Sequence, residues 1–163
     1  MLRHRIAAGF ALVALTILRL AGPVSAGEQV PFHGSFEGER TERIQLTPTT
    51  VQDTWDMAGT ATHLGHFELV EVVVVDFGTL PVTGVGTATF VAANGDMLFA
   101  DVTGYSEPVE PGVTVLIIES GVITGGTGRF AGASGSYTSE RLTSLVTNET
   151  IGSFEGTISS PGS

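Results

Sequence analysis

The sequence contains no cysteine and no lysine, and both absences exclude classes of function. Without thiols the chain cannot form disulfides, cysteine-based metal sites or a lipid-modified N-terminal cysteine. A domain of this kind is held together by its core and its backbone hydrogen bonds. Positive charge is also scarce, because residues 27–163 carry four arginines against 17 acidic residues, a formal charge of −13. Nucleic acids and anionic membrane surfaces repel such a chain, so we expect neither as a partner.

The first 26 residues have the layout of a cleavable secretory signal. Residues 3–5 read Arg-His-Arg and give a basic start, and residues 6–18 form an apolar run that is too short for a membrane span. Pro23 ends this region, and residues 24–26 supply the small side chains that a signal peptidase accepts. We therefore predict a signal peptide at 1–26, one domain at 27–163 with no membrane span, and a secreted or periplasmic location.

Helical patterns are almost absent from the predicted domain. Short runs rich in valine, isoleucine, threonine and phenylalanine alternate with glycine, proline, asparagine and aspartate, which predicts seven or eight strands of a sandwich or a barrel. The expected strands are 30–39, 59–77, 85–92, 97–105, 113–124, 130–143 and 151–159. Residues 44–46 either extend the first of these strands or begin the next strand. The expected longer loops are 47–56, 78–83 and 107–112.

Two features of these strands favour a closed barrel. The sequence Gly-Ser-Phe-Glu-Gly occurs unchanged at 34–38 and at 152–156, in the first and last expected strands, which are neighbours if the sheet closes. Small residues also alternate with one large residue on the inward positions, as in Gly86, Ala88 and Phe90. The tapering interior of a small barrel needs this mixture, whereas an open sandwich tolerates more uniform valine and leucine.

Residues 121–137 carry a resemblance to a known superfamily. A strand ends in a Gly-Gly-Thr-Gly turn at 125–128, Phe130 follows two residues later, and a small-residue strand then contains Gly135 and Tyr137. This pattern resembles the C-terminal hairpin of the allene oxide cyclase and dirigent barrels, particularly their exported bacterial members, and the likeness extends over roughly residues 59–158. It implies an eight-stranded antiparallel barrel with an apolar lumen, often a trimer. No segment matches the catalytic or pocket carboxylates of those families, so the resemblance assigns no catalytic residue.

Inward-facing aromatic and polar side chains are the candidate ligand contacts. Counting by twos from Ala61, one face holds His63, Phe67 and Glu71 among apolar residues, and polar groups in an apolar lumen are either hydrogen-bonded or functional. Glu119 interrupts an apolar strand, where it either lies in the lumen or points outward at an interface. The predicted lumen residues are His63, Phe36, Phe67, Glu71, Phe90, Glu119, Phe130 and Phe154.

The spacing of residues in the sequence supports neither a metal site nor a phosphate-binding loop. His63 and His66 are three residues apart and face opposite sides of a strand, which argues against a zinc site shared with His33. The glycine turn at 125–128 leads into a strand-like run and not into a helix, so it predicts a hairpin and not a phosphate-binding loop. We therefore expect no catalytic residue, no metal and no cofactor.

Three functions remain open. The favoured one is an exported, non-catalytic barrel that binds a small apolar or amphipathic ligand or a protein partner. The second is a cyclase- or isomerase-like enzyme, which requires at least two convergent polar groups in the lumen. The third is a structural envelope or matrix protein, because residues 70–75 and 113–118 are apolar on both faces. The same two segments favour a homo-oligomer, either a dimer or a trimer.

Overall fold

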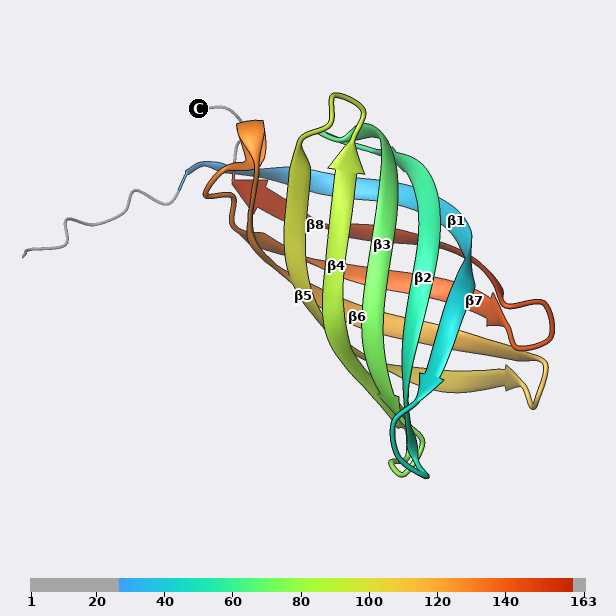
Figure 1. The fold of residues 1–163 in the computed structure, drawn as a ribbon. Coiled ribbons are helices and arrows are strands. Elements are labelled where there is room, and N and C mark those ends of the chain that lie inside the picture. Colours follow the sequence, from blue (N-terminus) through green and yellow to red (C-terminus); the bar gives the residue numbers. More distant parts are fainter. Residues whose placement is uncertain (1–26, 160–163) are drawn as a thin grey trace, which may run out of the picture.

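The computed structural model describes residues 27–159, and these form one closed antiparallel barrel of eight strands (Figure 1). The predicted signal peptide, residues 1–26, lies outside the described residues. No helix in the described range is long and apolar enough to cross a bilayer. The elements are β1 (Gln29–Gln45), β2 (Thr50–Ala61), β3 (Gly65–Asp76), β4 (Val82–Ala92), β5 (Met97–Glu110), β6 (Thr114–Gly126), the short 3₁₀-helix η1 (Gly128–Phe130), β7 (Gly135–Ser144) and β8 (Glu149–Ser159).

Each strand pairs with the next one in the sequence, and β1 pairs with β8 to close the sheet. The two Gly-Ser-Phe-Glu-Gly segments meet at this closure, where Phe36 lies opposite Gly152 and Gly34 lies opposite Phe154. A large side chain on one strand therefore faces a glycine on the other. The rings of Phe36 and Phe154 are stacked at 25° with their centroids 6.5 Å apart. The prediction of a closed eight-stranded barrel with adjacent terminal strands is confirmed.

The core fills the end of the barrel that contains the turns between β2 and β3 and between β4 and β5. Phe154 is central there, because its ring contacts the rings of Phe32, Phe36, Phe67, Phe90 and Tyr137 at centroid distances from 4.8 to 6.5 Å. Such edge-on and tilted pairs add to the free energy gained by burying the rings. This end of the barrel is therefore filled by side chains and is called the narrow end below.

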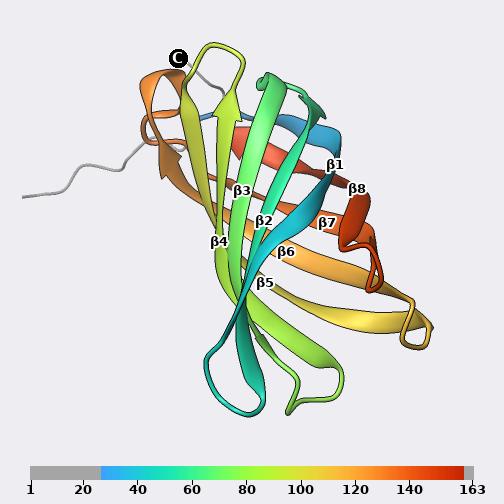
Figure 2. The same ribbon diagram turned by 45° about the vertical axis from the view of Figure 1, so that its right-hand side comes forward.

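The opposite end is wider, because the hairpins that form it diverge. The β1–β2 and β3–β4 hairpins extend in one direction, while the β5–β6 and β7–β8 hairpins extend in another (Figures 1 and 2). Pairing between β1 and β8 stops at Glu39 and Glu149, although β1 continues alongside β2 as far as Gln45. The last part of β1 thus leaves the β1–β8 seam. The end of the barrel that contains the diverging hairpins is called the wide end below.

Several predicted boundaries are wrong. The expected loop at 47–56 is mostly strand, because β2 starts at Thr50 and turns Val51, Asp53 and Trp55 inward. The expected single strand at 59–77 is split by a turn at 62–64 into the end of β2 and the start of β3. β5 continues to Glu110, which lies within the expected loop at 107–112. β7 starts only at Gly135, since Phe130 belongs to η1.

Candidate functional site

An apolar cavity of about 480 Å³ lies at the wide end, between the diverging hairpins. Strands from both sides of the barrel line it, together with the loops after β3 and after β5. Its volume falls within the range of roughly 300–1,000 Å³ that is typical of small-molecule sites. Its apolar wall includes Trp55, Val73, Val75, Phe77, Leu80 and Ile117.

A buried trio of charged residues lies at the inner end of this cavity. Arg141 on β7 donates from Nη2 to Oε1 of Glu71 on β3 at 2.7 Å and to Oε1 of Glu119 on β6 at 3.1 Å. The side chains of Arg141, Glu71 and Glu119 are 1%, 5% and 7% exposed. The guanidinium also lies 4.6 Å from the centre of the Trp55 ring, a cation–π contact that strengthens when water is excluded. Arg141 and Glu119 border the cavity directly.

Burial changes the protonation of this trio. Removal from water raises the pKa of Glu71 to about 8; the guanidinium of Arg141 opposes this shift, and Glu119 adds to it. Burial by itself lowers the pKa of Arg141, but the two neighbouring carboxyl groups raise it above its ordinary value. At neutral pH this raised pKa keeps a proton on Glu71.

Arg141 does not use all of its hydrogen-bond donors within residues 27–159. Nη2 serves both carboxyl groups, while Nη1 contacts only the thioether of Met57, at 3.7 Å. The buried Nε has no hydrogen-bond partner in the described part of the chain. Buried donors are nearly always paired, so an unpaired one calls for an explanation.

A second ion-pair cluster lies at the rim of the cavity. Asp53 is buried and accepts two hydrogen bonds of 2.6 Å from Nε and Nη2 of Arg43, while Arg40 lies 3.7 Å away from it. Arg40 also donates to the side-chain oxygen of Asn148. The guanidinium groups cover aromatic rings, Arg40 over Trp55 at 5.7 Å and Arg43 over Phe77 at 5.5 Å. Three of the four arginines in residues 27–163 thus surround one cavity.

Seven of the eight predicted lumen residues lie inside the barrel. Glu71 and Glu119 belong to the buried trio, and Glu119 borders the cavity. The five phenylalanines fill the narrow end and leave the cavity wall to other side chains. They are Phe36, Phe67, Phe90 and Phe154 on the strands and Phe130 in η1. Whether any of these residues contacts a ligand stays a prediction.

The prediction for His63 is wrong. His63 is exposed in the turn between β2 and β3, with φ at +63°, and its Nε2 lies 3.1 Å from the carbonyl oxygen of Pro31. The count by twos that placed it in the lumen assumed one continuous strand from 59 to 77. The left-handed backbone at His63 and Gly65 turns the chain there and ends the alternation.

The sequence interpretation missed Arg141, Trp55 and Asp53. Arg141 was detectable, because counting by twos from Tyr137 along the expected strand reaches it. The alternate residues of β7 are indeed buried, namely Tyr137, Ser139, Arg141 and Thr143. The inward direction of Trp55 and Asp53 was not predicted, because the polar residues around them resemble a loop. Their inward direction depends on the pairing of β2 with β1 and β3.

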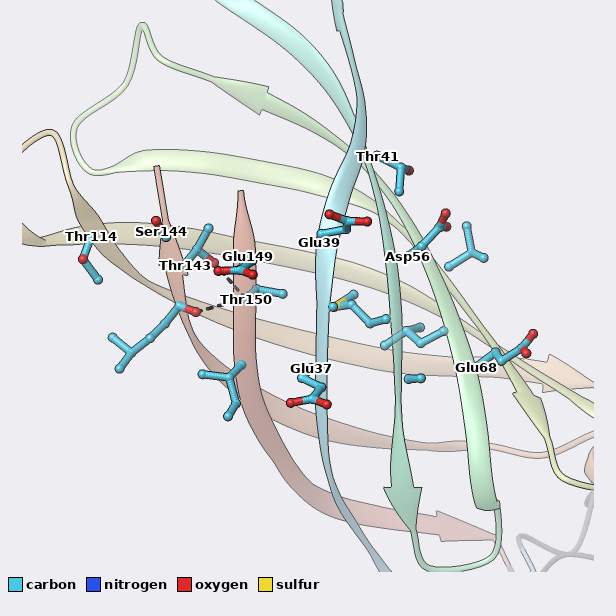
Figure 3. A pocket seen from close by; sticks show the side chains of 17 residues that line it. Glu37, Glu39, Thr41, Asp56, Glu68, Thr114, Thr143, Ser144, Glu149 and Thr150 are labelled. Atoms are coloured by element: carbon cyan, nitrogen blue, oxygen red, sulfur yellow. Dashed lines mark hydrogen bonds between the residues drawn. The ribbon is translucent and has the colours of Figure 1, made fainter. Parts of the chain in front are cut away.

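An acidic groove runs along the outside of the barrel where β1 leaves β8. Figure 3 shows the carboxylates of Glu37 and Glu39 on β1, Asp56 on β2 and Glu68 on β3, with Glu149 across the groove. No arginine is among the residues that line it in the described range. Within residues 27–159, no group of three or more histidine and acidic side chains is placed to hold a metal ion. This groove repels anions, and its lining is more polar than that of the cavity.

Comparison with known proteins adds no assignment. A scan against protein-family models finds no matching family, and searches of curated proteins and of solved structures find no match. The candidate function therefore rests on the geometry of the cavity and of its buried charges.

Proposed function

We propose that this protein is an exported, non-catalytic barrel that binds a small apolar or amphipathic molecule in the cavity at its wide end. The observation that carries this proposal is the cavity of about 480 Å³, with a largely apolar wall and a few buried polar groups at its inner end. Binding sites for small molecules have this composition. The basic start and apolar run of residues 1–26 support export.

The proposal includes membership of the allene oxide cyclase and dirigent superfamily. Support comes from the hairpin pattern at 121–137 and from the eight-stranded antiparallel topology. One fold serves many activities, so this resemblance supports the architecture and does not select a ligand.

A cyclase- or isomerase-like reaction inside the barrel is the second candidate. One specific observation favours it: Glu71, Glu119 and Arg141 converge at the inner end of the cavity. A carboxyl group with a pKa near 8 can act as a proton donor at neutral pH. We rank this candidate lower, because Glu71 does not border the cavity.

Assembly into a dimer or trimer, with an envelope or matrix role, is the third candidate. Apolar side chains remain exposed on the outer surface, including Val70, Val85 and Val122, which are 41%, 56% and 57% exposed. Apolar groups that lie close together on a surface often mark an interface. Sedimentation at micromolar concentration tests this candidate, and a monomer would remove its support.

Titration with the fluorescent naphthalene N-phenyl-1-naphthylamine tests the main proposal on the protein spanning residues 27–163. Trp55 is the single tryptophan and borders the cavity, so its emission should change as the probe saturates the site. Gly84→Leu places a side chain into the cavity from β4, where a Cβ atom at Gly84 meets nothing closer than 3.8 Å. We expect this variant to weaken probe binding by about tenfold or more, because it fills the site.

Val85→Leu is the matched control, since Val85 follows Gly84 on β4 and points outward. We expect its affinity for the probe to equal that of the unchanged protein. An absence of saturable binding, or binding that Gly84→Leu leaves unchanged, would contradict the proposal.

A further inference from the structure

Arg141 is a buried residue whose guanidinium lacks strong hydrogen-bond partners for some of its donors within residues 27–159. Its side chain is 1% exposed, yet Nε lacks a partner within residues 27–159 and Nη1 has only a thioether at 3.7 Å. A thioether is a weak acceptor. Leaving a buried donor unpaired costs free energy, and the cost is largest for donors that belong to a charged group. An acceptor beside Arg141 would remove this cost.

The position of Arg141 determines where such an acceptor can come from. Glu71 and Glu119 are both already bound to Nη2, and Trp55 covers the guanidinium with its ring. Arg141 also borders the apolar cavity. A molecule in the cavity can therefore place an acceptor atom against the guanidinium while its apolar part contacts the wall.

The charges around Arg141 favour an uncharged acceptor. Arg141 already contacts two carboxyl groups, and a proton on Glu71 neutralises only one of them, so the trio has no surplus positive charge. An anion added beside it would leave a net negative charge in a buried site, which is costly. At the rim, Arg40 and Arg43 share the carboxylate of Asp53, and the cavity lining also includes Glu107.

We propose that Arg141 recognises the carbonyl oxygen of an uncharged ketone, aldehyde, ester or amide at the inner end of an otherwise apolar ligand. This inference rests on the proposed function, because it names the ligand class for the same cavity. The carbonyl oxygen accepts a hydrogen bond from the guanidinium, and the apolar remainder of the ligand packs against side chains such as Val73, Phe77 and Ile117.

Three naphthalenes of similar size test the proposal by displacement of N-phenyl-1-naphthylamine. They are 2-acetonaphthone, 2-isopropenylnaphthalene, in which a methylene group replaces the carbonyl oxygen, and 2-naphthoate, which carries a carboxylate. We expect the ketone to bind about tenfold more tightly than the hydrocarbon, since a hydrogen bond from a charged donor has an effect of this size. We expect the carboxylate to bind most weakly. The infrared carbonyl stretch of bound 2-acetonaphthone should also move to lower wavenumber.

Two variants assign this preference to Arg141. Arg141→Met removes every donor but leaves two buried carboxyl groups without a cation, so it can fail to fold. The triple variant Glu71→Leu, Glu119→Leu and Arg141→Met replaces the whole trio with apolar side chains, an exchange that buried ion pairs often tolerate. In the folded variant, we expect the ketone and the hydrocarbon to bind within about threefold of each other, because the hydrogen-bond donor is gone.

The outcomes separate this inference from the proposed function. Equal affinities for the ketone and the hydrocarbon, or tightest binding by 2-naphthoate, would overturn carbonyl recognition while leaving ligand binding in the cavity intact. A ketone preference that persists in the triple variant would overturn the role of Arg141. If N-phenyl-1-naphthylamine and all three compounds fail to bind, the proposed function fails and this inference fails with it.

Discussion

Nη2 of Arg141 lies 2.7 Å from Oε1 of Glu71, although the two residues are 70 positions apart in the sequence. Arg141 is on β7 and Glu71 is on β3, so three strands lie between them in either direction around the eight-stranded barrel. Their ion pair therefore spans the lumen and joins opposite walls. It also separates the aromatic core at the narrow end from the cavity at the wide end.

The stability of the barrel should depend on pH through Glu71. Its pKa is about 8 in the folded protein, above the ordinary value of 4.5, so the folded state holds a proton that the unfolded state releases. This contribution to stability is complete below about pH 4.5 and is lost as pH rises to about 8. Glu71→Gln removes this dependence. Between about pH 5 and pH 8 we expect the free energy of unfolding to fall by roughly 3 kcal/mol more in the unchanged protein than in the variant.

Urea unfolding at a series of pH values measures this difference. Glu68→Gln is the control, because Glu68 lies on the same strand, points outward and is exposed. Its unfolding free energy should follow that of the unchanged protein across the pH range. If Glu71→Gln also follows the unchanged protein, the assigned protonation of the trio is incorrect.

Phe154→Ala should be among the most destabilising single substitutions in the barrel. The Phe154 ring contacts five other aromatic rings and is 3% exposed, so its removal leaves a large cavity at the narrow end. We expect a loss of about 3–5 kcal/mol in the free energy of unfolding. Phe99→Ala removes the same atoms from a side chain that is 36% exposed, and it should cost much less. Similar losses for both variants in denaturant unfolding would argue against the aromatic core.

Gly121→Ala should destabilise the barrel because of the ring that lies over this glycine. A Cβ atom at Gly121 would lie only 2.2–2.7 Å from three carbon atoms of the Tyr137 ring, and Tyr137 is buried and has little space to move. We expect a loss of about 1–3 kcal/mol, as is usual for overpacking. Gly84→Ala is the control, because its Cβ atom would meet its nearest neighbour at 3.8 Å. Thermal unfolding that shows equal melting temperatures for the two variants would contradict this packing.

Much of the fold could be predicted because a strand has a period of two residues. Alternation of glycine or alanine with phenylalanine identified the inward positions of β1, β4 and β8, and the repeated segment indicated that β1 and β8 are neighbours. The prediction was wrong where a local signal competed with the alternation. Polar residues at 50–56 resembled a loop, and the left-handed turn at His63 was not visible in an apolar run.

The candidate site was only partly predictable. Glu71 and Glu119 were recognised as polar residues in apolar strands, but neither their shared partner Arg141 nor the ring of Trp55 was identified. Local alternation indicates whether a side chain points inward. It does not indicate which inward side chains meet across the lumen.

The sequence by itself determined the all-β class, the inward face of most strands and the adjacency of the first and last strands. These properties depend on neighbours along the chain and on repeated patterns. The tertiary structure alone decided that the wide end holds a cavity, that Arg141 pairs with carboxyl groups on two other strands, and that His63 lies outside. Those outcomes depend on strand register and on the divergence of the hairpins, which bring residues from distant parts of the chain together.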